Sequence, residues 1–289
     1  MAESLITATL GAQLIETFDN PDYRPPPLPG VALELMSLSN RDDASIDRIV
    51  RLLEQDEMLA GGVMRLIGSP LYVARTRIRS LKEAVVRLGV RTVRDLVFEV
   101  ALNQGVFRLA EYGETIEQIR RHSTVTAYIA RIVCKHAKID EEHAFLCGLL
   151  HDIGFAGLLF AVSNIEAEAS PPLIQLWPEI DFLHERASRI ITQLWQLPVE
   201  LQEVVGHHHH LHTGETSRVA AAIHIADRLS ERFGASVVGP VDENGVLLAG
   251  DAVNDFDLEV SRGELGLTEQ TLERIIEEAE VLVPDILWL

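Results

Sequence analysis

Apolar residues recur at helical spacing along most of the chain. In the N-terminal third they form short runs, such as those at 46–53 and 64–67. A repeat of three to four residues is typical of amphipathic helices, whereas strands alternate with a period of two. We therefore expect one amphipathic segment within residues 1–24, an extended proline-rich stretch at 24–30, and a helix that begins near Val31.

Start and stop signals divide this first region into several short helices. Ser80 and Glu83 have the spacing of a capping box, and Thr92 with Asp95 repeats that spacing. The glycine pair at 61–62 is expected to interrupt another helical run. The N-terminal third therefore reads as a bundle of short helices.

The helical pattern continues beyond this bundle, but the polar residues within it change. All eleven histidines lie between His122 and His224. Further on, the Asn-Gly pair at 244–245 could close a small hairpin, and Thr268 is expected to cap a last helix that runs to about Leu282.

Strand patterns long enough for a central sheet are absent from the sequence, so the expected fold class is all-α. We predict a two-lobed helical bundle with a short mixed C-terminal extension. The expected divisions are an N-terminal lobe, a histidine-rich second lobe and the extension, at residues 1–112, 113–234 and 235–289.

Composition narrows the possible partners. The chain has 25 basic and 44 acidic side chains, a net charge of −19, which disfavours binding to nucleic acid. Cys134 and Cys147 are too few for a disulfide framework and suit a reducing compartment. We found neither a secretory leader nor an apolar run of roughly 18 residues. These features predict a cytoplasmic protein with no membrane or nucleic-acid partner.

An adjacent histidine and aspartate are the first candidate for chemistry. His151 and Asp152 follow an apolar run that we expect to be a helix ending at Gly154, with His143 and Cys147 on the same face as His151. Imidazole and carboxylate groups bind divalent cations, and the two oxygens of Asp152 could bridge two of them. The same pair is also found at helix C-termini, where the acid is solvated. The spacing alone does not decide between a metal site and such a helix end.

Two further residues favour the metal interpretation. His122 is expected to open a helix, and Asp227 lies in an otherwise apolar helix, where an unpartnered carboxylate would be costly. One cation held by His122, His151, Asp152 and Asp227 would satisfy all four groups. The alternative is that Asp227 finds an ordinary hydrogen bond or an arginine such as Arg228.

A second group of histidines begins with His184. A later helix is expected to end at Gly206 and to run directly into His207–His210. That helix gives the chain a fixed exit direction, so we expect His207 and His208 to point inward. A solvated turn is the expected setting of His209, His210 and His212.

Several segments together resemble the HDOD family, a branch of the HD phosphohydrolase superfamily, over about residues 25–234. They are PPLPGVALELM at 26–36, the run at 49–69, SPLY at 69–72, IRSLKEAVVRLG at 78–89 and GLLHDIG at 148–154. The resemblance implies a helical regulatory module that often serves as an output domain in bacterial signal transduction. Many members have lost the HD metal ligands and have no established activity.

The related HD-GYP phosphodiesterases extend this resemblance to a ligand set. His122, His151, Asp152 and Asp227 match the HD ligands. His184, His207 and His208 match the positions that hold a second metal, with the register within His207–His210 open by one residue. Two features of those enzymes are missing. Phe155 stands where they have a lysine that assists with the substrate phosphate or leaving group, and no Gly-Tyr-Pro follows the histidines.

Three functions remain open from the sequence. The first is a bacterial HDOD signalling protein that retains one or two divalent transition metals (Fe, Mn, Ni, Co or Zn) and acts through a protein partner. The second is a metal-dependent phosphohydrolase with Asp152 as a catalytic residue and a nucleotide or other phosphoester as substrate. The third is a scaffold whose histidines are polar filler. The retained ligands argue against the third, and Phe155 with the acidic surface favours the first.

Overall fold

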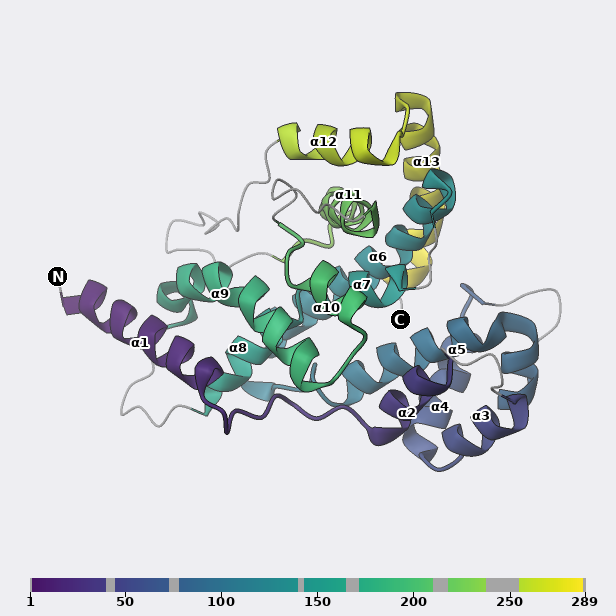
Figure 1. The fold of residues 1–289 in the computed structure, drawn as a ribbon, viewed down its shortest axis with the longest axis horizontal. Coiled ribbons are helices and arrows are strands. Elements are labelled where there is room, and N and C mark those ends of the chain that lie inside the picture. Colours follow the sequence, from purple (N-terminus) through teal and green to yellow (C-terminus); the bar gives the residue numbers. More distant parts are fainter. Residues whose placement is uncertain are drawn as a thin grey trace.

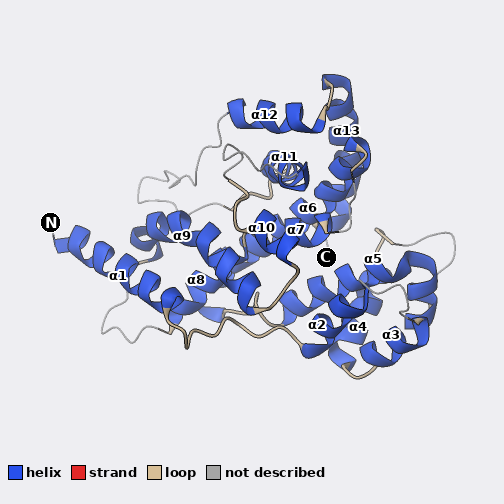
Figure 2. Ribbon diagram, in the orientation of Figure 1, coloured by secondary structure: helices blue, strands red, loops and turns tan. Residues whose placement is uncertain are grey.

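The computed structural model describes residues 2–39, 45–72, 78–139, 143–164, 172–209, 218–237 and 255–287. Every regular element within these ranges is a helix, as Figures 1 and 2 show, which confirms the all-α fold class. In chain order the elements are α1 Ala2–Asp19, α2 Gly30–Ser39, α3 Ile46–Leu53, α4 Glu57–Ile67, α5 Leu81–Gln104, the 3-10 turn η1 Ala110–Tyr112, α6 Gly113–Ala137, α7 Ala144–Leu150, α8 Ile153–Ser163, α9 Leu173–Leu194, α10 Val199–Val205, α11 Arg218–Arg232, α12 Asp255–Leu265 and α13 Glu269–Ile286.

The first helix does not lie with the helices that follow it. In Figure 1, α1 packs along α9 and α8, while α2 to α5 form a bundle at the other end of the molecule. The guanidinium of Arg186 on α9 forms an ion pair with Asp19 at the end of α1. The proline-rich stretch then crosses to the bundle, and the indole N–H of Trp195 donates to the carbonyl oxygen of Pro26 (3.1 Å).

Local signals located the N-terminal ends of some helices. The backbone N–H of Glu83 donates to the hydroxyl of Ser80 (3.1 Å), which confirms the cap at the start of α5. The second predicted capping box was wrong. The kink in α5 lies at Gly89, where φ is 84°. Asp95 is buried inside the helix and binds the guanidinium groups of Arg94 (2.8 Å) and Arg131.

The glycine pair in α4 does not interrupt the helix, contrary to the prediction. A Cβ atom on Gly62 would lie 2.3 Å from Cγ1 of Val100, so this glycine lets α4 lie directly against α5. The helix break lies earlier, at 54–56, where the carboxylate of Asp56 accepts from the N–H of Leu59 (3.0 Å) and starts α4.

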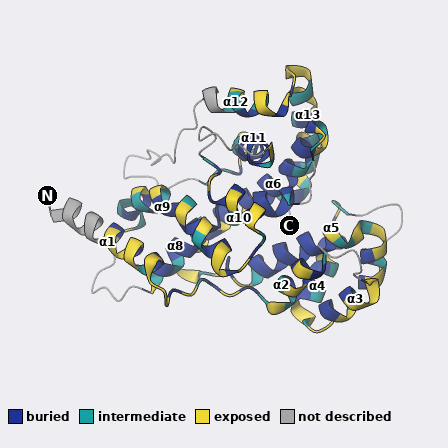
Figure 3. Ribbon diagram, viewed as in Figure 1, coloured by how far each residue is buried: buried dark blue, intermediate teal, exposed yellow. Residues whose placement is uncertain are grey.

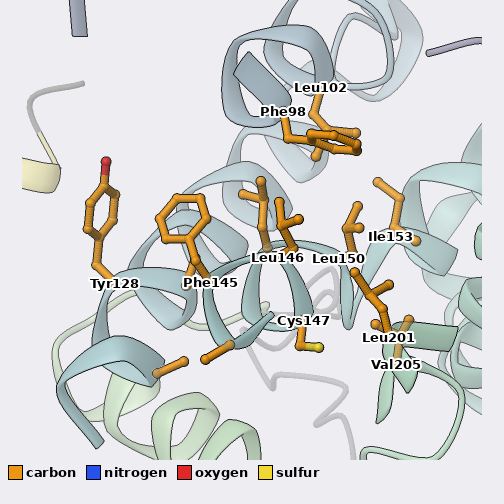
Figure 4. Packing of buried hydrophobic residues seen from close by; sticks show 14 of the residues in the cluster. Phe98, Leu102, Tyr128, Phe145, Leu146, Cys147, Leu150, Ile153, Leu201 and Val205 are labelled. Atoms are coloured by element: carbon orange, nitrogen blue, oxygen red, sulfur yellow. The ribbon is translucent and has the colours of Figure 1, made fainter. Parts of the chain in front are cut away.

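A single apolar core joins the N-terminal bundle to the histidine-rich helices. Figure 4 shows Phe98 and Leu102 of α5 against Leu146 and Leu150 of α7, and Figure 3 shows how completely α7 and α8 are covered. Contrary to the sequence expectation, one stretch, Ala144–Ser163, is long and apolar enough for a membrane span, but 94% of its 18-residue apolar window is buried inside the protein. It forms α7 and α8, two core helices separated by a short turn.

The C-terminal extension closes over α6 and α11. Nδ1 of His224 on α11 and the hydroxyl of Ser261 on α12 lie 2.9 Å apart in a buried hydrogen bond. The last helix is confirmed with Thr268 as its N-cap, and it runs on to Ile286. The hairpin expected at 244–245 lies outside the described residues.

Candidate metal centre

The turn between α7 and α8 carries His151 and Asp152. The predicted single helix ending at Gly154 was wrong, because α7 ends at Leu150 and α8 begins at Ile153. Gly154 is not a helix terminator. A Cβ atom there would lie 1.9 Å from the carbonyl oxygen of His184, so the glycine allows the backbones of α8 and α9 to touch. This close approach brings Asp152 next to His184.

One side of Asp152 faces His122, His151 and Asp227. His122 lies in the middle of α6 rather than at its start, and its Nε2 is 3.0 Å from Asp227 Oδ1, 3.3 Å from Asp152 Oδ2 and 3.0 Å from His151 Nε2. His151 Nε2 is 3.3 Å from the same Asp152 oxygen and 3.8 Å from Asp227 Oδ1. The carboxylate of Asp227 faces these imidazoles, and Arg228 forms an ion pair with Glu231 (2.6 Å). We call this set the first group.

The other oxygen of Asp152 faces a second group of histidines. Its Oδ1 lies 3.2 Å from His208 Nε2 and 3.6 Å from His184 Nε2. Nε2 of His209 lies 3.0 Å from Nε2 of His184. The two carboxylate oxygens of Asp152 thus point to different groups, as a carboxylate that bridges two cations would.

The structure shifts the histidine register by one residue. His208 lies in the turn after α10 and is buried like Leu201 and Val205 of that helix, whereas His207 is exposed and its Nδ1–H donates to the carbonyl oxygen of Glu203 (3.1 Å). The chain after Val205 continues to turn as a helix, so His208 falls on the buried face. The expectation for His207 was therefore wrong, and His209, expected in a solvated turn, joins the second group. His210 and His212 lie outside the described residues.

Backbone carbonyls fix the tautomers of the buried histidines. A carbonyl oxygen only accepts hydrogen bonds, so each bonded Nδ1 carries the ring proton and each Nε2 presents its lone pair to the site. The acceptors are Ala235 for His122 (2.7 Å), Gly148 for His151 (2.8 Å), Val205 for His208 (2.8 Å) and Asp181 for His184.

The resulting arrangement places acceptors against acceptors. With both rings neutral, His122 and His151 direct two lone pairs at each other across 3.0 Å, and neither can donate. Asp152 Oδ1 and His208 Nε2 are buried without a hydrogen-bond partner among the described residues. Buried acceptors in such contact need a proton or a cation between them. The donor set of imidazoles and carboxylates fits a divalent metal.

The electrostatics of the two groups differ. Burial opposes protonation of His122 and His151, but the carboxylates of Asp152 and Asp227 outweigh it, so the pKa of His122 lies well above 6.5 and that of His151 is about 9. Burial would raise the pKa of both carboxyl groups, yet these imidazoles hold it well below 3.8. In the second group, burial lowers the pKa of His184 and, with His208 nearby, that of His209 to about 4.

Two contacts of the second group were missed by the sequence reasoning. Glu185 accepts the backbone N–H of His209 (3.1 Å) and so ties the histidine turn to α9. The ring of Phe155 is buried and lies flat on the imidazole of His184, with centroids 4.2 Å apart. Neither contact has a sequence signal. The burial of His208 does have a sequence signal, because His208 lies three residues after Val205 and seven after Leu201, which is the spacing of one helix face.

Comparisons with known proteins agree with this architecture. The chain is 26% identical over 216 residues to an uncharacterized protein of Treponema pallidum, a match over 71% of this chain that spans 40% of the relative's length. It is similar to a solved Geobacter sulfurreducens HDOD domain protein of unknown function, with a TM-score of 0.69, 21% identity and coverage of 96% of this chain and 95% of that one.

A second solved structure is similar along its whole length. This protein of Shewanella amazonensis, provisionally described as a metal-dependent phosphohydrolase, has a TM-score of 0.73 at 19% identity, covering 99% of this chain and 100% of that one. At these identities the two structures show a shared fold. The family model of the HDOD domain matches residues 26–211, more than half of the sequence. The chain therefore belongs to the HDOD family.

Proposed function

We propose that this chain is a metal-binding HDOD signalling protein that holds a divalent transition cation on each side of Asp152. The observation that carries the proposal is the set of four buried imidazoles whose Nδ1–H groups are bonded to backbone carbonyls, so that their Nε2 lone pairs converge on the two oxygens of one carboxylate. Backbone orientation of this kind is characteristic of histidine ligands to metals.

Each side of Asp152 offers its own ligand set. The first cation would be held by the first group, with Asp227 opposite the two imidazoles. The second would be held by His184, His208 and His209, with Asp152 shared between the two. Imidazole nitrogen with carboxylate oxygen favours Fe, Mn, Ni, Co or Zn over Mg.

Three features favour signalling over rapid turnover. The position beside His184 is filled by the apolar ring of Phe155, which offers no charge for a phosphate. The chain carries a net charge of −19, which does not attract anionic substrates. The side chains of Asp152 and His184 are each 7% exposed. We therefore propose that a protein partner recognises and binds the metal-loaded protein.

The decisive measurement is the metal content of the full chain, purified without a polyhistidine tag and quantified by plasma mass spectrometry. We expect two cations per chain in the wild type, and none in the double variant His151→Ala, Asp152→Ala. His208→Ala should lose the second cation, whereas His207→Ala, which changes an exposed neighbour in the same histidine run, should retain both. Equal metal content in all four proteins would overturn the proposal.

A metal-dependent phosphohydrolase is the second candidate. Its support is the shared Asp152, since two cations bridged by a carboxylate supply an activated water and a positive field for a phosphate. In that case the chain's own task is to hold Asp152 and the five imidazoles in place and to keep them dry.

This candidate is tested with the metal-reconstituted chain and a panel of nucleoside phosphates, cyclic mononucleotides, cyclic dinucleotides and a chromogenic phosphodiester. Asp152→Asn keeps the side-chain shape but loses the bridging charge and should abolish any hydrolysis, whereas His207→Ala should not. Fast, Asp152-dependent turnover of a cyclic dinucleotide would make hydrolysis the primary function. Silence with both cations bound would favour signalling by contact.

A further inference from the structure

Three aromatic rings stack next to the second group. Phe155, in the first turn of α8, lies between Trp177 and His184 of α9. Its ring centroid is 4.2 Å from that of His184 at an interplanar angle of 8°, and 5.3 Å from that of Trp177 at 9°. All three residues are buried, with exposures of 4%, 1% and 5% for Phe155, Trp177 and His184.

The shortest carboxylate contact of His184 is longer than the shortest contact of either histidine in the first group. His122 is 3.0 Å from Asp227 and 3.3 Å from Asp152, but His184 is 3.6 Å from Asp152. Its Nδ1–H is bonded to the carbonyl of Asp181, one turn earlier on the same helix. This hydrogen bond, together with the covalent attachment of the ring, orients the imidazole, and a further contact can hold its plane more firmly.

The Phe155 ring provides a second restraint on His184. Parallel stacking confines the imidazole of His184 to one plane, and in this plane its Nε2 points at Asp152 Oδ1 and at Nε2 of His209. Trp177 supports Phe155 from the opposite face. The absence of a side chain at Gly154 brings the ring into contact, because any Cβ there would push α8 away from the His184 backbone.

We propose that Phe155 is a positioning residue for the second cation: through its stack with His184 it sets the occupancy of the second site, and the first site does not depend on it. This inference rests on the proposed function. The competing explanation is that Phe155 only fills the core, in which case its loss would lower stability without changing either site.

Cobalt titration of the chelated full chain separates the two explanations, because the visible absorption of bound Co²⁺ reports its ligands directly. We expect the wild type to bind two cobalt ions. Phe155→Leu should bind one ion with unchanged affinity and the other roughly 10- to 100-fold more weakly, which is the loss seen when supporting contacts of a metal ligand are removed. Phe155→Tyr retains the ring and should restore both sites.

Phe145→Leu is the matched control for lost aromatic packing. Phe145 is 1% exposed and packs edge-on against Tyr128 with Arg131 above its ring, away from the ligands. This variant should be less stable than the wild type but should bind two cobalt ions normally.

The possible outcomes are distinct. Two ions bound by Phe155→Leu at wild-type affinity would overturn the positioning role while leaving the metal function intact. A wild type that binds no cobalt would overturn both. If Phe155→Leu does not fold, Trp177→Leu decides, because removing the outer ring should weaken only the second site, and wild-type affinity at both sites would refute the stack.

Discussion

The contact between α8 and α9 at Gly154 can be tested by adding one methyl group. In Gly154→Ala, the new Cβ would lie 1.9 Å from the His184 carbonyl oxygen and 2.7 Å from the Ser188 nitrogen. Ordinary contacts begin at 3.4 Å, so the two helices must separate by about 1.5 Å. Both clashing atoms belong to the backbone, and no side-chain rotation can relieve them.

The expected cost follows from three contributions. Overpacking of this kind costs about 3 kcal/mol when nothing can yield. The hydrogen bond from the Gly154 N–H to the Ser188 hydroxyl (2.8 Å) would also break, with a loss of about 1 kcal/mol. Alanine regains up to about 1 kcal/mol of helix propensity. The net loss of about 3 kcal/mol corresponds to a fall in Tm of roughly 6 to 12 °C.

Thermal unfolding followed by circular dichroism measures this loss, and metal analysis of the same samples measures its effect on the site. Because Asp152 precedes α8 and His184 lies on α9, separation of the helices should also empty the second site. Gly61→Ala is the control: its Cβ would meet nothing closer than 3.8 Å, so it should leave Tm unchanged or raise it. A Tm within 2 °C of the wild type for Gly154→Ala would refute the reasoning.

Two further predictions concern residues away from the metal centre. Burial raises the pKa of Glu99 to about 7, so the folded state holds this proton more tightly than the unfolded state, and about 3 kcal/mol of stability present below pH 4.5 is lost as the pH rises to 7. Glu99→Gln keeps an acceptor for the Tyr128 hydroxyl (3.1 Å). In urea unfolding, this variant should be more stable than the wild type at pH 8 but not at pH 4.5. Equal stability of the two proteins at pH 8 would contradict this prediction. Ser80→Ala removes the cap of α5 and should cost about 1 kcal/mol, whereas Thr92→Ala, inside the same helix, should cost much less. Similar losses in the two variants would argue against the cap.

The sequence by itself determined the features that depend on neighbouring residues. The helical class, the N-caps at Ser80 and Thr268 and the burial of Asp227 all followed from spacing along the chain. These features are set by contacts within one or two helical turns, and the pattern of apolar residues records such contacts directly. The HDOD resemblance was likewise carried by local segments, and the family match confirms it.

Tertiary structure decided which side chains meet. Gly62 and Gly154 read locally as breakers, yet each is small because another helix lies against it. His209 and Phe155 carry no signal of their role, since both depend on the position of His184 on a different helix. A glycine or an aromatic residue has the same local preference wherever it stands. Only the element packed against it determines whether it ends a helix, fills a core or orients a ligand to a metal.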